Sequence, residues 1–295
     1  MGRRAGVLAL ALLLYIGVAG LFLLSVSALG SGREAGFGFG PRVAVVEVEG
    51  MIVDAEEVLR DLKAHRENPL VRAVVMRINS PGGVVAPTQE IYQAVQRVRE
   101  AGKPVVASLG SVAASGGYYI AAAANEIYAN PGTLTGSIGV IMQLANVESL
   151  MKKIGVEWVV VKAGAFKDLG NVGRPMTPEE RRVLQALLDD VHGQFIAAVA
   201  EGRKLDRAEV VRFADGRVFT GTQAQSLKMV DKLGGFEDAI DAAGRLAGLA
   251  TPPRVILPRR RFSIFDLVKN QIGLPYPSAL TRSLPVFKTP LYLME

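Results

Sequence analysis

The sequence contains no cysteine, only two histidines and a single tryptophan among its 295 residues. The lack of cysteine excludes disulfides, thiolate metal ligands, a cysteine nucleophile and a cysteine-linked lipid anchor. His65 and His192 are the only side chains whose ordinary pKa lies near neutral pH. Any catalysis must therefore use oxygen and nitrogen groups, and we expect no cofactor and no metal.

Charge of either sign is missing from residues 5–30, which are mostly Leu, Ala, Val, Gly and Ile. A bilayer core of about 30 Å needs about 20 apolar residues in a helix, and the apolar part of a cleavable signal peptide is shorter. Residues 1–30 are therefore predicted to be an uncleaved transmembrane signal anchor in contact with membrane lipid. Because Arg3 and Arg4 precede the run, the positive-inside rule keeps the N-terminus cytoplasmic and places the rest outside the cell. The alternative is cleavage near "VSALG", which would release a soluble secreted protein.

Acidic residues are scarce after residue 250, where seven Lys and Arg stand against two Asp and Glu. The basic run at 258–262 is interpreted first as a solvated loop and next as a contact for anionic lipid or an acidic protein surface. No nucleic acid partner is expected for a domain outside the cell. Prolines without a clear period predict an extended C-terminal extension over 251–295.

Residues 31–41 form a Gly-rich linker, and the pattern that follows over 42–250 predicts one α/β domain. Because parallel strands need crossover connections, alternating strands and helices indicate parallel pairing. Val-rich, alternating or short apolar runs predict the strands, at 42–50, 71–79, 104–110, 126–132 and 156–164. Helical spacing predicts helices at 54–67, 88–102 and 177–202, the last opened by a capping box, and two further helical pieces within 220–248.

Ser115 stands between small residues and a glycine pair in "GSVAASGGYY", residues 110–119. A predicted strand leads into this turn and an Ala-rich helix follows it, so backbone N–H groups lie beside the serine. Gly116 allows close approach, and Gly82 and Gly83, after the preceding strand, offer a second set of donors. Such donors suit a serine whose attack on a carbonyl creates an oxyanion. The same local motif is also typical of a helix N-cap.

A serine nucleophile needs a base, and neither histidine lies near the glycine motifs in the sequence. A Ser-His-Asp triad is therefore unsupported, although the order of its members varies among folds. A lysine serves as base when burial lowers its pKa from about 10.4 toward about 7–8. Lys162 and Lys167 both lie in or after the predicted strand at 156–164, and residue chemistry alone does not choose between them. A salt bridge to Asp168 would oppose the required shift, so that carboxylate is expected to point away from the base.

Three segments in order resemble signal peptide peptidase A of bacteria and archaea, in its short single-domain form. They read "INSPGGVVAPTQEIYQAV", "GSVAASGGYYIAAAANEIYANPGTLTGSIGV" and "GAFKDLGNVGRPMTPEER". The resemblance covers roughly residues 42–250. It implies the Clp-protease and crotonase type of fold, a spiral of ββα units.

The resemblance also implies roles for single residues. Ser115 would be the nucleophile, Lys167 the general base and Ser137 the residue that binds the amine of that lysine, while the backbone N–H groups of Gly82 and Gly116 would form the oxyanion hole. Short-form members are similar to ring assemblies in which the serine and the lysine of one site come from neighbouring subunits, so a homo-oligomeric ring is expected.

The implied activity is that of a serine endopeptidase at the outer face of a prokaryotic plasma membrane. Its substrates would be hydrophobic peptides such as cleaved signal peptides. Two alternatives remain open, because one fold hosts many functions. The first is a crotonase-like enzyme acting on acyl-CoA thioesters, which needs no Ser-Lys pair. The second is a non-catalytic membrane-anchored scaffold in which Ser115 only caps a helix.

Overall fold

The computed structural model describes residues 14–18, 20, 40–258 and 291–293. The chain divides into two compact units, residues 1–40 and residues 41–295. In the first unit residues 14–18 and 20 are helical. Among the described residues, no helix has the length and apolar character needed to cross a membrane. Most of the predicted anchor and linker, and most of the C-terminal extension with its basic run, lies outside the described residues.

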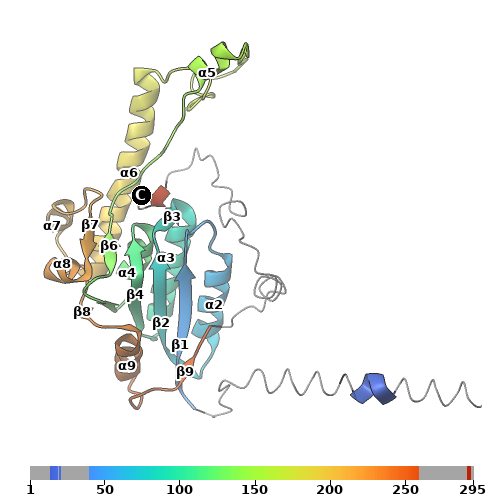
Figure 1. Cartoon of the computed structure of the whole chain (residues 1–295). Coiled ribbons are helices and arrows are strands. Elements are labelled where there is room, and N and C mark those ends of the chain that lie inside the picture. The colour runs from blue at the N-terminus through green and yellow to red at the C-terminus, as the bar shows by residue number, and fades with distance from the viewer. Residues whose placement is uncertain (1–13, 19, 21–39, 259–290, 294–295) are drawn as a thin grey trace, which may run out of the picture. The chain divides into compact units, whose positions relative to one another are not determined.

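A mixed sheet forms the centre of the second unit (Figure 1). Its longest strands are β1 (Arg42–Glu49), β2 (Val71–Ser80) and β4 (Val105–Ala114), which run parallel with β2 in the middle. The shorter strands extend this sheet and are β5 (Glu126–Ala129), β6 (Leu134–Gly136), β7 (Val218–Thr220), β8 (Lys232–Leu233) and β9 (Val255–Ile256). Of the pairs described in this sheet, only that of β6 with β7 is antiparallel. The predicted strands at 42–50, 71–79, 104–110 and 126–132 are confirmed.

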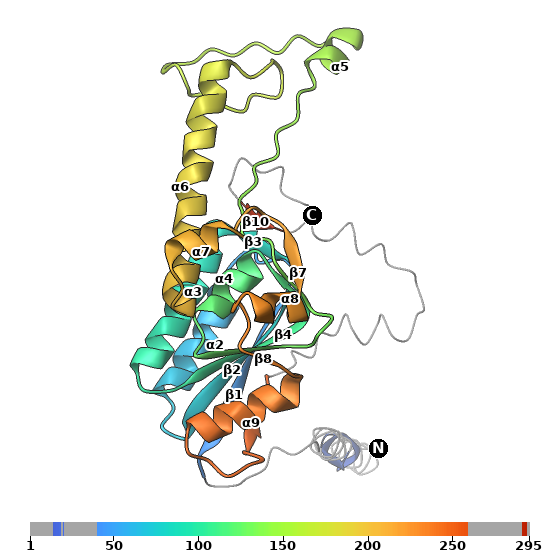
Figure 2. The same ribbon diagram turned by 90° about the vertical axis from the view of Figure 1, so that its left-hand side faces the viewer.

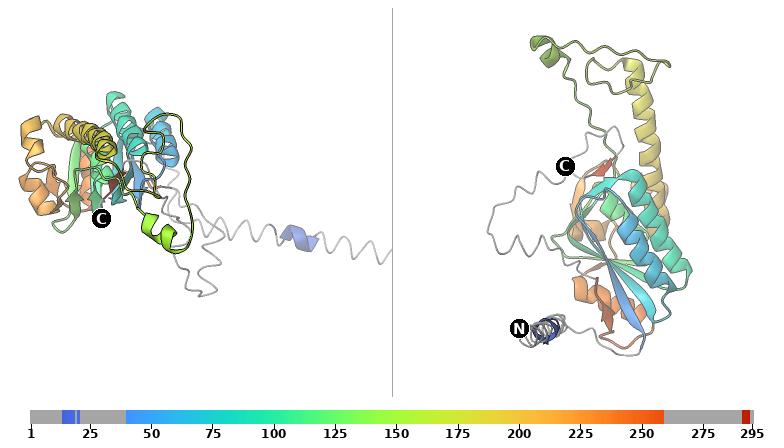
Figure 3. Two further views of the ribbon diagram at one scale, coloured as in Figure 1. Left: turned by 90° about the horizontal axis from the view of Figure 1, so that it is seen from above. Right: turned by 90° about the vertical axis from the view of Figure 1, so that its right-hand side faces the viewer.

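Helices cover both faces of the sheet (Figures 2 and 3). Because side chains alternate along a strand, Val43 and Val45 of β1 pack in one cluster with Ile240, whereas Ala44 and Val46 pack in another with Ile91. The first cluster includes α9 and the second includes α2, α3 and α4. The helices are α2 (Glu56–Glu67), α3 (Val85–Glu100), α4 (Gly116–Ala122), α5 (Glu148–Lys153), α6 (Pro178–Arg203), α7 (Arg207–Val211), α8 (Gly221–Ser226) and α9 (Phe236–Leu246).

The long helix α6 is fixed to the body of the domain at its C-terminal half. Phe195 is fully buried, and the centroid of its ring lies 4.9 Å from that of Tyr119 in α4. A Cβ on Gly202 would lie 2.0 Å from the carbonyl oxygen of Ala122, so only glycine permits this approach. At its other end the predicted capping box is confirmed, with Pro178 as the first helical residue.

Residues 141–177, which we call the arm, extend away from the sheet together with the N-terminal half of α6 (Figures 1 and 2). No residue from 141 to 179 is buried. The strand predicted at 156–164 is wrong: these residues form no strand, and Val161 is 96% exposed. The Val-rich run has the composition of a buried strand, but within the described chain no neighbouring strand pairs with it.

Two short strands lie apart from the large sheet. β3 (Gly82–Val84) pairs antiparallel with β10 (Leu291–Leu293), with Gly83 opposite Tyr292. The other edge of β3 meets Ile52, which donates its N–H to the Gly82 oxygen (2.9 Å) and accepts from the Val84 N–H (2.7 Å). β3 therefore carries both glycines of the "SPGG" motif between two backbone partners.

Candidate active site

Ser115 occupies the sharp turn between the end of β4 and the start of α4. Its backbone angles are φ +53° and ψ −119°, a conformation that costs a non-glycine residue roughly 1–3 kcal/mol. The turn is fixed from both sides by backbone hydrogen bonds. The Ser115 N–H donates to the Gly136 carbonyl oxygen (2.7 Å), and the Ser115 carbonyl oxygen accepts from the Tyr119 N–H (2.8 Å). Strained strand-to-helix turns of this kind carry the nucleophilic serine in α/β-hydrolases.

The Ser115 hydroxyl is fully buried, and Oγ has no hydrogen-bond partner among the described residues. Ser115 holds the N-cap position of α4, but its side chain makes no capping hydrogen bond. The N-cap interpretation of the motif is therefore wrong for this side chain. A buried polar group without a partner is unfavourable, so it calls for an explanation in function.

Ser137 emerges beside Ser115 at the same end of the sheet. β6 pairs parallel with β4 so that Gly136 lies opposite Ala114. These are the last residues of the two strands, and Ser137 and Ser115 follow them directly. Ser137 is 7% exposed and also has a positive φ, +51°. The structure thus brings these two predicted site residues together.

The glycine backbones also meet at this turn. A Cβ built on Gly116 would lie 3.2 Å from the Gly82 Cα, 3.3 Å from the Gly83 nitrogen and 2.9 Å from Thr88 Oγ1. Such distances leave no room for a side chain at residue 116. The two glycine motifs, separate in the sequence, therefore form one backbone surface beside Ser115.

The two glycines of "SPGG" differ in what their N–H groups do. The Gly82 N–H donates to Ser80 Oγ (3.1 Å), and Ser80 in turn donates to the Gly50 oxygen (2.6 Å). Because the Gly82 oxygen and the Val84 N–H face Ile52, the alternation of a strand turns the Gly83 N–H to the opposite edge, toward β10. The resemblance implies Gly82 as an oxyanion donor, but in this structure its N–H is engaged by Ser80. The difference between the two glycines lies in the pairing with Ile52, which the sequence does not record.

Lys167 lies on the arm and is exposed. Its backbone N–H donates to the Gly164 oxygen (3.2 Å), and its amine makes no hydrogen bond with Ser115, whose Oγ has no partner in the part of the chain that the structure describes. A single chain therefore does not bring the predicted base to the predicted nucleophile. It also does not provide the burial that the role of base requires.

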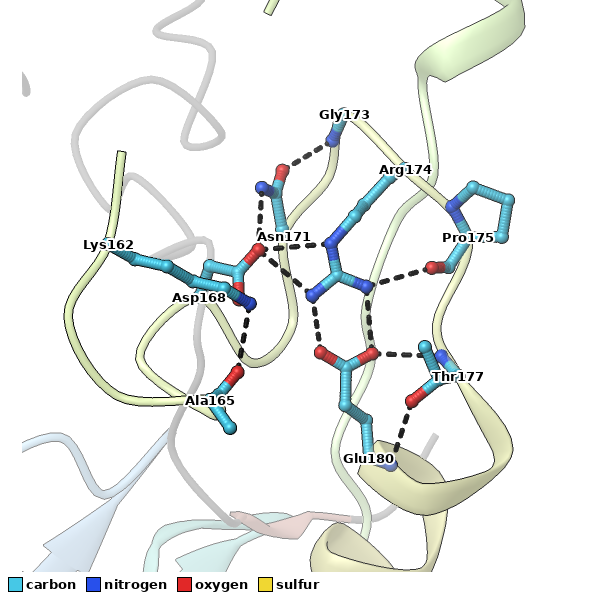
Figure 4. Close-up of polar contacts among 9 residues, drawn as sticks. All are labelled: Lys162, Ala165, Asp168, Asn171, Gly173, Arg174, Pro175, Thr177 and Glu180. Atoms are coloured by element: carbon cyan, nitrogen blue, oxygen red, sulfur yellow. Dashed lines mark hydrogen bonds and ion pairs between the residues drawn. The ribbon is translucent and has the colours of Figure 1, made fainter. Parts of the chain in front are cut away.

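The carboxylate of Asp168 is directed to two other cations (Figure 4). Lys162 donates to it and to the Ala165 oxygen (2.8 Å), and Arg174 donates from Nε (3.0 Å) and Nη2 (2.9 Å). These hydrogen bonds hold the pKa of Asp168 well below its ordinary value. The bond from Lys162 has the largest effect, and the bond from Arg174 has the next largest effect among the donors. Asp168 thus points to cations other than Lys167, as predicted, and the amine of Lys162 is already engaged.

The histidines take no part in the turn. His65 lies on α2, where burial lowers the pKa of its imidazole, and His192 lies on α6. Neither is hydrogen-bonded to Ser115 Oγ, which has no partner within the described chain. A Ser-His pair is therefore not formed here.

Comparison with known proteins identifies the family. The profile of peptidase family S49 matches residues 97–250, and that of Clp protease matches residues 46–134. An inferred protease of Synechocystis sp. is 48% identical over 210 residues, which cover 70% of this chain and 75% of that protein.

Two further relatives extend the comparison. Protease 4 of Salmonella typhi is 37% identical over 219 residues, covering 71% of this chain and 35% of the relative. An inferred signal peptide peptidase, SppA, of Enterococcus faecium is 34% identical over 214 residues, covering 68% of this chain and 62% of the relative. The matched region thus spans about a third of one of these two proteins and under two thirds of the other. This chain, with its Clp-protease-like α/β domain, belongs to peptidase family S49.

Proposed function

We propose that the protein is a serine endopeptidase with Ser115 as its nucleophile. The observation that carries this proposal is the buried Ser115 Oγ, which has no partner among the described residues and is held at a strained turn beside the backbone of Gly82, Gly83 and Gly116. Membership of a protease family supports it. A relative named signal peptide peptidase suggests hydrophobic peptides, such as cleaved signal peptides, as substrates.

In the proposed mechanism the neutral amine of Lys167 takes the proton of Ser115 as Oγ attacks the carbonyl carbon of the scissile peptide bond. The oxyanion accepts hydrogen bonds from the Gly116 N–H and, because the Gly82 N–H is held by Ser80, from that of Gly83. Collapse breaks the C–N bond, and the leaving amine receives the proton from the lysine. Water, deprotonated by the same amine, then attacks the ester and frees the serine, while Ser137 holds the amine in place.

The lysine of each site is proposed to come from a neighbouring copy of the chain in a ring. The support is the incomplete site of one chain, together with a large apolar surface on the arm that a monomer leaves in water. The exposed apolar residues of this surface are Leu150, Ile154, Val156, Trp158, Val159, Val160, Val161 and Phe166. Packing the arm against a second copy would also bury the lysine.

Substrates are proposed to bind as an extended strand along the outer edge of β3. This edge already accepts the backbone of β10 in antiparallel register, at the turn that carries Ser115. Main-chain bonds of this type bind a peptide with little regard to its side chains. In this proposal the substrate takes the place of Leu291–Leu293.

Residues 5–30 are proposed to anchor the protein in the plasma membrane with the catalytic domain outside the cell. The support is the uncharged run itself, which exceeds the roughly 20 residues needed to span a bilayer, preceded by Arg3 and Arg4. The anchor would keep the site beside the membrane, where signal-peptide remnants are released.

The test is incubation of the full-length protein in detergent with a Leu-rich signal peptide, followed by mass spectrometry. We expect fragments from the wild type and none from the Ser115→Ala variant. If the wild type yields no fragments from such peptides, the scaffold alternative gains the support that the peptidase loses.

Gly116→Ala is expected to reduce turnover by roughly 100-fold, because the methyl group would displace the backbone donors from their positions around the oxyanion. Gly132→Ala is the matched control, since nothing lies within 4 Å of the Cβ it would add. Initial rates on a fluorogenic peptide and thermal melts measure both variants. Equal rates for the two would contradict the placement of the oxyanion at Gly116.

A further inference from the structure

Arg174 makes five hydrogen bonds, one from Nε and two from each terminal nitrogen, so each of its N–H groups has a partner (Figure 4). Two go to Asp168, two to Glu180 and one to the Pro175 oxygen (3.1 Å). The guanidinium thus joins two carboxylates that lie on different segments. One is adjacent to Lys167 in the sequence, and the other is in the first turn of α6.

Both carboxylates are well covered although the arm around them is not. The side chains of Asp168 and Glu180 are 11% and 5% exposed. Glu180 is also fixed by the capping box, accepting from the Thr177 N–H (2.8 Å) while its own N–H donates to Thr177 Oγ1 (3.1 Å). Arg174 and then this capping bond lower the pKa of Glu180 to about 2, so the carboxylate stays charged at neutral pH.

The ion-paired cluster connects the loop of Lys167 to the core through α6. The arm has no buried residue of its own, so apolar packing within one chain does not fix the backbone at residue 167. The C-terminal half of α6 is packed against α4, the helix that follows Ser115. A continuous connection therefore runs from the nucleophile helix along α6, through Glu180 and Arg174, to Asp168.

From this connection we infer that Arg174 is a positioning residue for the general base: it holds the Lys167 loop at a fixed place on the start of α6. The inference rests on the proposed role of Lys167. Arg174 has no contact with the reacting atoms in this assignment and acts only through the backbone of the loop.

The test is Arg174→Lys, which keeps the charge but replaces the planar group of five donors by a single ammonium. The ammonium lacks the fork that donates paired hydrogen bonds to Asp168 and to Glu180. A misplacement of the base by about 1 Å reduces turnover strongly. We expect kcat on a fluorogenic peptide to fall roughly 10- to 100-fold with KM within about threefold of the wild type. Asp168→Asn should act in the same direction.

Arg203→Lys is the matched control for loss of an arginine fork elsewhere. Arg203 donates to Asp231 Oδ1 (2.6 Å) and to the Lys228 oxygen (3.2 Å), and its side chain is 6% exposed. This variant should lower Tm and leave kcat unchanged. The inference is overturned if Arg174→Lys lowers Tm alone, or if both variants reduce kcat equally.

A second measurement separates positioning from folding. In the Lys167→Ala background, activity restored by added ethylamine no longer depends on the loop, so Arg174→Lys should leave the restored rate unchanged. A restored rate that falls by the same factor as in the wild type would overturn the inference. If Lys167→Ala itself retains full activity, the base of the proposed function is wrong, which is a different result from a silent Arg174 variant beside an inactive Lys167→Ala.

Discussion

Replacing Ser115 by alanine is expected to reduce peptide turnover by roughly 10⁴-fold or more and to leave the fold intact. The loss follows because Oγ is the only atom of the site that is proposed to form a covalent bond to the substrate. Initial rates on a fluorogenic Leu-rich peptide measure it against the wild type.

Stability should respond in the opposite sense to that of an ordinary buried serine. Within a single chain Ser115 Oγ has no partner among the described residues, so in the unassembled chain its removal abolishes an unfavourable burial, and the free energy of unfolding should be unchanged or higher by about 1 kcal/mol. Ser108 is the matched control, since it is 1% exposed and its hydroxyl accepts a bond from Arg77 Nη1 (2.9 Å). Ser108→Ala should lower the free energy of unfolding in urea by about 1 kcal/mol or more and preserve turnover.

The opposite pattern would remove the nucleophile assignment. If Ser115→Ala retains turnover, or unfolds as easily as Ser108→Ala, the hydroxyl is structural and its strained backbone needs another cause. The stability measurement is informative on its own, because it needs no substrate.

Much of the central sheet was predictable from local patterns. The strands β1, β2 and β4 contain nearly continuous apolar runs because both of their faces are covered by helices, and such runs can be recognised in the sequence. The start of α6 was predictable for a similar reason, since the capping box of Thr177 and Glu180 is complete within four residues. The short elements α7 and β7 carry too few residues for a period, and they were not predicted.

The Val-rich run at 156–164 shows where local pattern fails. Apolar and β-branched composition is typical of a buried strand, but it does not show whether a neighbouring strand is there to pair with the segment. In the arm these residues meet no strand of the described chain, so the same composition that predicted β4 correctly gave a wrong strand here. Lys167, which follows this run, is predicted as the base by resemblance alone, because residue chemistry does not choose between it and Lys162. The burial that would support Lys167 is absent from one chain.

Other parts of the site depend on geometry that no motif records. The choice between the Gly82 and Gly83 donors is set by the bridge to Ile52, a residue some thirty positions earlier in the sequence. The Arg174 contacts join residues that are close in sequence, but the motif "GRPM" does not predict them. They form only because the fold turns the carboxylates of Asp168 and Glu180 toward the same guanidinium group. The neighbourhood of Ser115 and Ser137, in contrast, follows once β4 and β6 are known to be parallel.

Two inactive variants should give an active protein when they are assembled together. Lys167→Ala is expected to lose roughly 10³-fold or more in turnover, since none of the described side chains is bonded to Ser115 Oγ and none could take over as the base. If the lysine of each site comes from the neighbouring copy, a mixture of Ser115→Ala and Lys167→Ala chains contains sites with both groups intact. With random 1:1 assembly in a ring of identical heterologous contacts, about a quarter of the sites are complete.

The measurement is to unfold and refold the two variants together and to compare turnover with each variant refolded alone. A mixture of Ser115→Ala with the double variant is the control, because it contains no intact serine and should stay inactive. If native mass spectrometry detects mixed assemblies but turnover does not return, the lysine must reach Ser115 within its own chain. The arm would then have to fold back over the sheet, and the exposed surface from Leu150 to Phe166 would need a partner other than a second copy. Return of about a quarter of the wild-type rate would instead make the arm the element that builds the active site, since the base would be supplied and buried by the same contact.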